Sequence, residues 1–286
     1  MRSLQTRLTN IQHMSNLIKR AIFGGLYVGL ILAALLLGSH TLYMVVFGVI
    51  VFLGTWEWSN LVSTHRIYPL RRIVDASAGV YLFWVTHTIA DGGPNYLMFL
   101  LPYAGYLLYL LVRSIYSERE LMPGDLAKVF FGQIYVAGFM SIANIYYTST
   151  TTPLLLLTVF VAIWANDTGA YLAGSTFGKH KLFPSVSPKK SWEGFFGGFV
   201  ASIIAAGLLL GWKPSSLVFG AVISIAATWG DLFESMIKRQ VGVKDSGNII
   251  PGHGGILDRI DSLLLVLPFV ALVEWAIHIY QELHLL

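Results

Sequence analysis

Apolar runs of about 20 residues, separated by short polar segments, recur along most of this chain. A helix of that length crosses the hydrocarbon core of a bilayer. Only 12% of the residues are charged, whereas a soluble domain carries about 25%. The sequence therefore predicts an all-α, polytopic membrane protein with about nine transmembrane helices. The nine apolar spans lie near residues 21–38, 41–62, 73–90, 95–113, 129–148, 153–177, 193–211, 215–235 and 262–280.

Basic residues predict the orientation of these spans. Every lysine and arginine except Lys213 lies in, or at the edge of, alternate polar segments, beginning with the N-terminal one. Because cytoplasmic loops are enriched in Lys and Arg, this pattern predicts a cytoplasmic N-terminus and an outside C-terminus. The net charge of +4 is thus explained by topology and contact with anionic lipid head groups, not by nucleic acid binding. The predicted inside segments are 1–20, 63–72, 114–128, 178–192 and 236–261.

Charged residues within the spans are concentrated in the second half of the chain. Spans one to five contain few of them, among which are Glu57, between two tryptophans, and Asp75. For Glu57 we expect a structural or interfacial role. We therefore divide the chain into an N-terminal transmembrane scaffold of about five helices, residues 1–150, and a C-terminal catalytic region of about four helices and cytoplasmic loops, residues 151–286.

Two further features of the sequence restrict its interpretation. Cysteine is absent, so the chain has no disulfides, no thiolate metal ligands and no thiol nucleophile. A cleaved signal peptide is the alternative for the first span, but no clear small-residue cleavage site follows it.

The sixth span contains Asn166, Asp167 and Thr168 within an apolar run. A charged aspartate at the centre of a transmembrane helix costs about 3 kcal/mol. The three polar residues are therefore predicted to line a cavity. Hydrogen bonding between helices is the alternative, because Asn and Thr often make such contacts in membranes. Three glycines allow close helix approach and predict a packing role: Gly169, Gly174 and Gly178.

The loop after the sixth span is rich in lysine. Ser187 and Pro188 resemble a helix start, since proline is favoured in the first turn. The lysines that follow would then lie where backbone N–H groups point outward, which suits a bound phosphate. An ordinary basic cytoplasmic loop is the alternative, and it is the preferred interpretation for Lys179 and Lys181. The candidate substrate-binding residues of this loop are Ser187, Lys189, Lys190, Ser191 and Glu193.

At the end of the eighth span, Asp231, Glu234, Ser235 and Lys238 are related by three and four residues. On a helix they share one face, while apolar residues cover the other. Arg239 follows directly. This pattern predicts a charged, solvated face at the inner end of the span. The alternative is an intrahelical ion pair of Glu234 with Lys238, which contributes little by itself.

Asp258 and Asp261 stand three residues apart at the start of the ninth span, so they also share one face. Oxygen ligands, without cysteine and with few histidines, favour Mg²⁺ over zinc. Carboxylates from two helix ends would hold one or two such ions and neutralise a polyphosphate. Helix capping by acidic residues is the alternative.

The glycine-rich turn at 252–255 offers N–H groups to a phosphate. Within it, His253 is a candidate phosphate donor, acid–base group or turn-stabilising residue.

Three blocks carry these residues. The main block runs Ser235-x-x-Lys238-Arg239-x4-Lys244-Asp245-x-Gly247-x3-Pro251-x-His253-Gly254-Gly255-x-x-Asp258-Arg259-x-Asp261, and the others are Asn166-Asp167-x-Gly169-Ala170-Tyr171 and Ser187-Pro188-Lys189-Lys190-Ser191-Trp192-Glu193-Gly194. Together they resemble the signature of the phosphatidate cytidylyltransferases, also called CDP-diacylglycerol synthases. The similarity covers residues 160–265, and the first five spans contribute only hydrophobicity.

The resemblance implies transfer of a cytidylyl group from CTP to phosphatidic acid, with Mg²⁺ in a two-cation site. It also implies a homodimer in a bacterial inner membrane, with the active site facing the cytoplasm. The residues expected to act in catalysis are Asp231, Lys238, Arg239, Asp258 and Asp261. The expected metal ligands are Asp231, Asp258 and Asp261. Asp167 is expected either to be a further ligand or to contact one of these ligands. The residues expected to bind substrate are Asn166, Asp167, Ser187, Lys189, Lys190, Ser191, Glu193, Glu234, Ser235, Lys244, Asp245, His253, Gly254, Gly255 and Arg259.

Other classes of membrane protein also use intramembrane aspartates. CDP-alcohol phosphotransferases typically carry an Asp-Gly-x-x-Ala-Arg run, and polyprenyl-phosphate sugar-phosphate transferases usually carry adjacent Asp pairs; neither pattern occurs here. A cation transporter could use Asp167 and Asp231 as ion ligands. Such a protein should distribute polar residues toward both membrane faces, whereas here they gather on the predicted cytoplasmic side.

Overall fold

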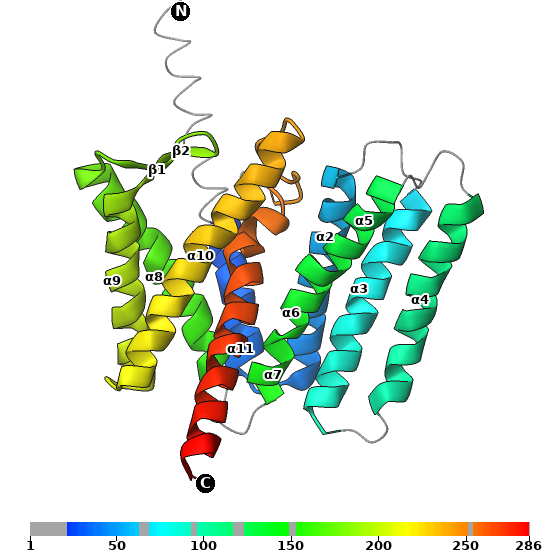
Figure 1. The fold of residues 1–286 in the computed structure, drawn as a ribbon, viewed down its shortest axis with the longest axis horizontal. Coiled ribbons are helices and arrows are strands. Elements are labelled where there is room, and N and C mark those ends of the chain that lie inside the picture. The colour runs from blue at the N-terminus through cyan, green and yellow to red at the C-terminus, as the bar shows by residue number, and fades with distance from the viewer. Residues whose placement is uncertain are drawn as a thin grey trace, which may run out of the picture.

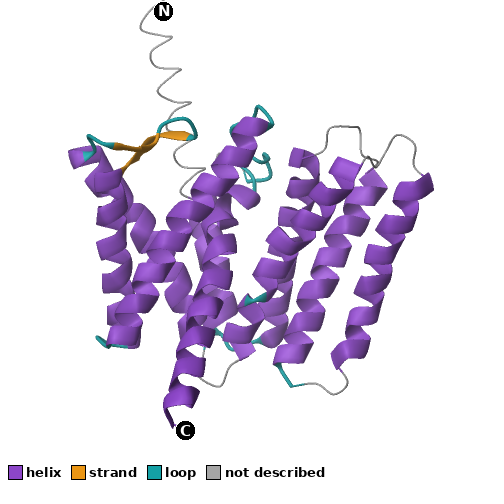
Figure 2. Cartoon of the chain, in the orientation of Figure 1, coloured by secondary structure: helices purple, strands orange, loops and turns teal. Residues whose placement is uncertain are grey.

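The computed structural model describes residues 22–62, 69–92, 96–116, 123–148, 153–250 and 254–285. These residues form a bundle of helices with a two-stranded hairpin at one end (Figures 1 and 2). The helical segments are Ile22–Leu36, α2 (His40–Val62), α3 (Pro69–Ala90), α4 (Tyr96–Tyr116), α5 (Pro123–Gly132), the π-helix η1 (Gln133–Gly138), α6 (Phe139–Ser141), α7 (Ala143–Thr148), α8 (Leu154–Phe177), α9 (Trp192–Leu210), α10 (Pro214–Gln240) and α11 (Leu257–Leu285). The strands are β1 (Lys181–Phe183) and β2 (Ser187–Ser191).

Seven of the described helical segments are long and apolar enough to cross a membrane. They are α2, α3, the continuous segment Gly124–Thr148, α8, α9, α10 and Leu257–Tyr280 of α11. The prediction of an all-α, polytopic membrane protein is therefore confirmed. The helix Ile22–Leu36 is apolar but shorter, and the total of nine spans stays a prediction.

Helix α11 lies between two groups of helices (Figure 1). It contacts α8 and α10 on one side and α2 and α6 on the other. Its residues Ile260, Leu264 and Leu267 recur at helical spacing and are fully buried. Since lipid is as apolar as leucine, such contacts stabilise a membrane bundle through close van der Waals packing. The start of α11, which carries three predicted site residues, is thus held by both halves of the chain.

Glycines let α8 and α9 approach closely. A side chain at Gly197 of α9 would overlap Ala173 of α8 and would lie 2.8 Å from the carbonyl oxygen of Gly169. Small residues at such positions allow helix backbones to pack in contact within a membrane. The packing role predicted from the sequence is confirmed at Gly169 and Gly174, where an added Cβ would crowd atoms of α9. At Gly178 it would instead crowd the end of α8 itself and the hydroxyl group of Ser191.

Replacing Gly197 by alanine is expected to lower the thermal unfolding temperature of the detergent-solubilised protein. The added methyl group forces α8 and α9 apart, and overpacking of this kind costs about 1–3 kcal/mol. Gly105→Ala on α4 is the matched control, since no atom lies within 4 Å of its added methyl group. Equal unfolding temperatures for the two variants, measured by scanning fluorimetry, would contradict the close contact of α8 with α9.

The loop after α8 forms a hairpin, in which β1 and β2 pair antiparallel. The helix start predicted at Ser187 and Pro188 is wrong, because α9 begins at Trp192. Its N-cap is Ser191, whose Oγ accepts a hydrogen bond from the backbone N–H of Gly194 at 3.1 Å. The fixed φ of proline suits an extended strand as well as a first helical turn, so Pro188 was compatible with both. The lysines that follow it therefore lie on a strand.

The hairpin, the C-terminal end of α10 and the loop that leads to α11 lie at the same end of the bundle (Figure 2). The sequence predicted that the two large polar loops share one side, and this is confirmed. That this side faces the cytoplasm stays a prediction.

Candidate active site

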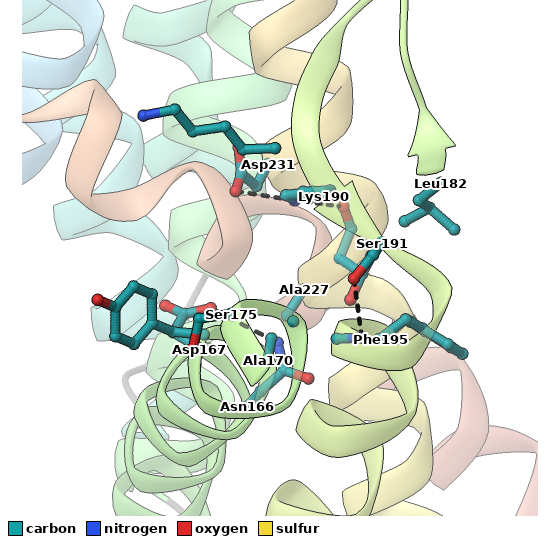
Figure 3. A pocket seen from close by; sticks show the side chains of 15 residues that line it. Asn166, Asp167, Ala170, Ser175, Leu182, Lys190, Ser191, Phe195, Ala227 and Asp231 are labelled. Carbon is teal, nitrogen blue, oxygen red and sulfur yellow. Dashed lines mark hydrogen bonds and ion pairs between the residues drawn. The ribbon is translucent and has the colours of Figure 1, made fainter. Parts of the chain in front are cut away.

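A cavity of ≈ 450 Å³ opens between α8, β2, α9 and α10 (Figure 3). Three elements that are distant in the sequence supply its polar lining. Among the predicted site residues in this lining, helix α8 contributes two, the hairpin strand β2 three, and α10 one. The predicted site residues in this lining are Asn166, Asp167, Lys189, Lys190, Ser191 and Asp231.

Lys190 and Asp231 form an ion pair in this cavity, with 2.8 Å between Nζ and Oδ2 (Figure 3). Nζ also donates to the carbonyl oxygen of Thr228 at 3.4 Å, and Ser235 Oγ donates to Asp231 Oδ1 at 3.2 Å. The side chains of the pair are 25% and 37% exposed, so a ligand can reach both. In an open pair of this kind, a phosphate oxygen can accept hydrogen bonds from the ammonium alongside the carboxylate.

Asn166 and Asp167 are neighbours on α8 with different contacts. Asn166 is buried, and its Oδ1 accepts a hydrogen bond from Ser224 Oγ of α10 at 2.6 Å. It therefore links α8 to α10, which is the interhelical role that the sequence left open. Asp167 is exposed and lines both this cavity and a second one. Asp167 is thus a carboxylate that the two cavities share.

The second cavity, of ≈ 210 Å³, lies between the helix Ile22–Leu36, α8 and the start of α11. The hydroxyl group of Tyr27 donates to the carbonyl oxygen of Arg259 at 3.3 Å, which connects the first helix to α11. The predicted site residues that line this cavity are Asp167, Asp258, Arg259 and Asp261. The carboxylates of the site are therefore distributed over two cavities that meet at α8.

Lys238 joins two carboxylates at the end of α10. Its Nζ lies 2.6 Å from Asp258 Oδ1 and 3.1 Å from Glu234 Oε1. The side chain of Glu234 is fully buried, and the other two are nearly so. The structure thus confirms that these residues share one face and contains the intrahelical pair that was the alternative. The predicted solvation of this face is wrong at Glu234 and Lys238, which are buried where α10 packs against α11. In this arrangement the ammonium of Lys238 neutralises two buried acids.

Asp258 also holds the loop before α11. Its Oδ2 accepts hydrogen bonds from the backbone N–H groups of Ser246 at 3.0 Å and Gly255 at 2.8 Å. Asp258 also stands in the first turn of α11, where a negative charge stabilises the start of a helix, and this is the alternative that the sequence left open. Gly254 has a φ of +79°, a conformation that favours glycine. The two predicted glycines therefore shape a tight turn around the Asp258 carboxylate.

Glu57 reaches the same loop from α2, a contact that the sequence did not predict. Its Oε2 accepts hydrogen bonds from the backbone N–H of Leu257 at 2.8 Å and from Ser246 Oγ at 3.2 Å. The side chain is 2% exposed. The sequence offered one indication of a role for Glu57, which is a carboxylate between two tryptophans in an apolar span. Nothing in the sequence paired it with a loop 200 positions later.

The remaining predicted residues make local contacts or lie at the surface. Glu193 accepts hydrogen bonds from the backbone N–H of His180 at 3.2 Å and contacts its Nδ1 at 2.6 Å, which closes the hairpin. Arg239 donates to a backbone carbonyl of the following turn at 2.8 Å. Ser187 is half-buried on β2. The exposed loop residues are Lys244 and Asp245. His253 lies outside the described residues.

The carboxylates provide oxygen donors for a cation. Among the described residues, no three His, Asp or Glu side chains converge on one point. However, Asp167 and Asp231 line the same cavity. Asp261 lies beside this part of α10, since a Cβ added at Gly230 would be 2.7 Å from the carbonyl oxygen of Asp261. In phosphate sites Mg²⁺ takes one or two carboxylates and completes its coordination with waters and phosphate oxygens. The donor set therefore fits Mg²⁺ bound together with a phosphate substrate.

Comparison with known proteins places this site in a family. The model of the cytidylyltransferase family matches residues 18–276. A phosphatidate cytidylyltransferase of Haemophilus influenzae is 36% identical over 88% of this chain and 96% of that protein. Proteins of the same name are 34% identical in Pseudomonas aeruginosa, over 80% of this chain and 86% of that protein, and 41% identical in Staphylococcus haemolyticus, over 56% and 64%. Because the family match spans both halves of the chain, this protein belongs to the cytidylyltransferase family.

Proposed function

We propose that this protein is a phosphatidate cytidylyltransferase, which transfers the cytidylyl group of CTP to phosphatidic acid and produces CDP-diacylglycerol and pyrophosphate. Relatives of that name support the reaction. The structural observation that carries it is the cavity with the Lys190–Asp231 pair at one end of a bundle of membrane-spanning helices. At such a place a water-soluble nucleotide can meet a phosphate that is anchored in the bilayer.

The reaction is a substitution at phosphorus. A phosphate oxygen of phosphatidic acid forms a bond to the α-phosphorus of CTP. The bond from this phosphorus to the oxygen that bridges to the β-phosphate breaks, and pyrophosphate leaves with the electron pair. The attacking phosphate is already anionic near neutral pH, so a strong general base is not required. Catalysis then depends mainly on positioning and on neutralising negative charge.

Lys190 and Lys189 are the phosphate-binding residues in this proposal. Both lie on β2 and line the first cavity. The ion pair with Asp231 keeps the Lys190 ammonium inside the cavity before substrate binds. A triphosphate would then meet a cation that is already placed, which lowers the cost of ordering a flexible side chain.

Mg²⁺, when bound, would withdraw negative charge from the reacting phosphates. Asp231 and Asp167 would hold it in the first cavity, and Asp261 is the third candidate ligand. Asp258 is occupied by Lys238 and by two backbone N–H groups. A site for two cations that includes Asp258 would therefore require this carboxylate to exchange Lys238 for a metal.

We also propose the membrane, the orientation and the assembly of the enzyme. The protein is a multi-pass membrane protein with bacterial relatives. We place it in the bacterial inner membrane with the active site toward the cytoplasm, where CTP is available. The basic loops support this orientation. A homodimer is the expected assembly, and nucleic acid is not an expected partner.

The decisive test is the reaction itself. Purified protein in detergent, given CTP, Mg²⁺ and phosphatidic acid, is expected to release pyrophosphate and to form lipid labelled from radioactive CTP. Omitting phosphatidic acid should abolish both products. Release of pyrophosphate without labelled lipid would indicate a CTP pyrophosphohydrolase. In a separate assay with CDP-diacylglycerol and an alcohol acceptor, transfer of the phosphatidyl group to the alcohol with release of CMP would indicate a CDP-alcohol phosphotransferase. Folded protein that forms no labelled lipid would contradict the proposal.

A further inference from the structure

A buried carboxylate of the scaffold half lies against the loop that begins α11. Glu57 stands on α2, and its side chain is 2% exposed. Its Oε2 accepts hydrogen bonds from the backbone N–H of Leu257 and from Ser246 Oγ. Leu257 is the first residue of α11, and the first N–H groups of a helix have no partner within the helix. Glu57 therefore supplies, from another helix, an acceptor that the start of α11 lacks.

The loop is shaped around this carboxylate. A side chain at Gly247 would lie 2.5 Å from Glu57 Oε1 and 2.9 Å from its Cδ. A side chain at Gly255 would overlap Oε2 of Glu57 and the hydroxyl group of Ser246. Gly247 has no positive φ, so the space beside Glu57, and not the backbone conformation, excludes a side chain there. Both glycines are thus sites where the loop backbone approaches Glu57 directly.

The residues that follow this contact are those of the proposed reaction. Asp258 is adjacent to Leu257 in the chain, pairs with Lys238 and accepts hydrogen bonds from the loop backbone. Asp261 lies one helical turn further and interacts with the charge of Asp231. A displacement of the first turn of α11 would therefore move both aspartates relative to α10.

We propose that Glu57 is a positioning residue for cytidylyl transfer. It holds the first turn of α11 and the loop residues Ser246, Gly247 and Gly255 in place, and thereby aligns Asp258 and Asp261 with the acidic face of α10. This inference rests on the proposed function for its kinetic consequences. Its structural content, the restraint of the loop by a residue of the scaffold half, is independent of the reaction.

Glu57→Ala is expected to lower kcat by about 100-fold, the loss that a displacement of ~1 Å produces. The KM for CTP should change by less than about threefold, because Glu57 touches the loop and not the Lys190 cavity. Glu57→Gln retains an acceptor oxygen for the Leu257 N–H, so it should keep at least about ten times the kcat of the alanine variant. Hydrogen exchange should show lost protection at the backbone N–H groups of Ser246 and Leu257 in Glu57→Ala and unchanged protection in α8 and α9.

Gly247→Ala provides a second and independent route to the same contact. The three atoms nearest to its added methyl group all belong to Glu57, and the substitution should lower kcat by about tenfold. In the double variant with Glu57→Ala, the obstructing carboxylate is absent. The double variant should therefore have the kcat of Glu57→Ala alone, since the two effects act through one contact.

Asp75→Asn is the matched control. Asp75 is a buried carboxylate on α3, bound by the Tyr106 hydroxyl at 2.8 Å, and its replacement should leave kcat within about threefold of wild type. An equal loss in this control, a multiplicative effect in the Glu57–Gly247 double variant, or wild-type kcat in Gly247→Ala would overturn the inference. If Glu57→Ala does not fold, the kcat of Gly247→Ala relative to wild type still tests the inference. Wild-type protein that makes no labelled lipid would reject the proposed function instead, and the hydrogen-exchange result would still test the restraint.

Discussion

Replacing Asp231 by asparagine is expected to lower kcat for CDP-diacylglycerol formation by about a thousandfold, the loss that follows removal of a preorganised charged contact. Asparagine keeps the size of the side chain but removes the charge that holds the Lys190 ammonium at 2.8 Å. It also removes an anionic oxygen that faces the first cavity and is a proposed Mg²⁺ ligand. The measurement is labelled lipid formed from radioactive CTP under saturating Mg²⁺ and phosphatidic acid.

Glu274→Gln is the matched control for this prediction. Glu274 is a half-buried carboxylate of α11 that interacts with Tyr146, away from both cavities. Its replacement should change kcat by less than about threefold. An Asp231→Asn variant that retains more than about a tenth of the wild-type kcat would show that Asp231 stabilises no charge in the transition state. It would also remove this residue from the proposed metal ligands.

Replacing Lys238 by methionine is expected to destabilise the protein by about 3–5 kcal/mol. Methionine fills much of the same volume, but it leaves the Glu234 and Asp258 carboxylates buried without the ammonium that neutralises both. An unpaired buried charge costs far more than the intact pair contributes. A large decrease in unfolding temperature should therefore accompany loss of activity. Unfolding in detergent can be followed by scanning fluorimetry together with resistance to proteolysis.

The double variant Lys238→Met with Glu234→Gln separates the electrostatic effect from a packing effect. Removing the charge of Glu234 leaves one buried acid in place of two, so part of the lost stability should return. If packing were the cause, the second substitution would give no recovery. An unfolding temperature of Lys238→Met equal to that of wild type would contradict the role of Lys238 as the neutralising cation.

The sequence predicted the membrane bundle because hydrophobic length is a local property. A run of about 20 apolar residues satisfies its backbone polar groups only as a helix within lipid, whatever its neighbours are. The positions of α2, α8 and α10 follow from this constraint. The spacing of Asp231, Glu234 and Lys238 likewise placed them on one helical face, and the structure confirms it.

The hairpin shows where local pattern was insufficient. Ser187 and Pro188 are compatible with a helix start and with a strand, and the pairing of β2 with β1 decided between them. Strand pairing depends on a second segment, so no property of one segment could reveal it. The same holds for Asn166, whose buried amide is used in a contact with Ser224 of another helix.

Residue types and their spacing by themselves determined the membrane-spanning helices and predicted which side chains carry the chemistry. Only the tertiary structure decided their partners: Lys190 with Asp231, Lys238 with Asp258, and Glu57 with the start of α11. Periodicity describes the faces of one helix, whereas these contacts depend on how helices cross. The crossings are set by packing between segments far apart in the chain, such as the glycine contact of α8 with α9.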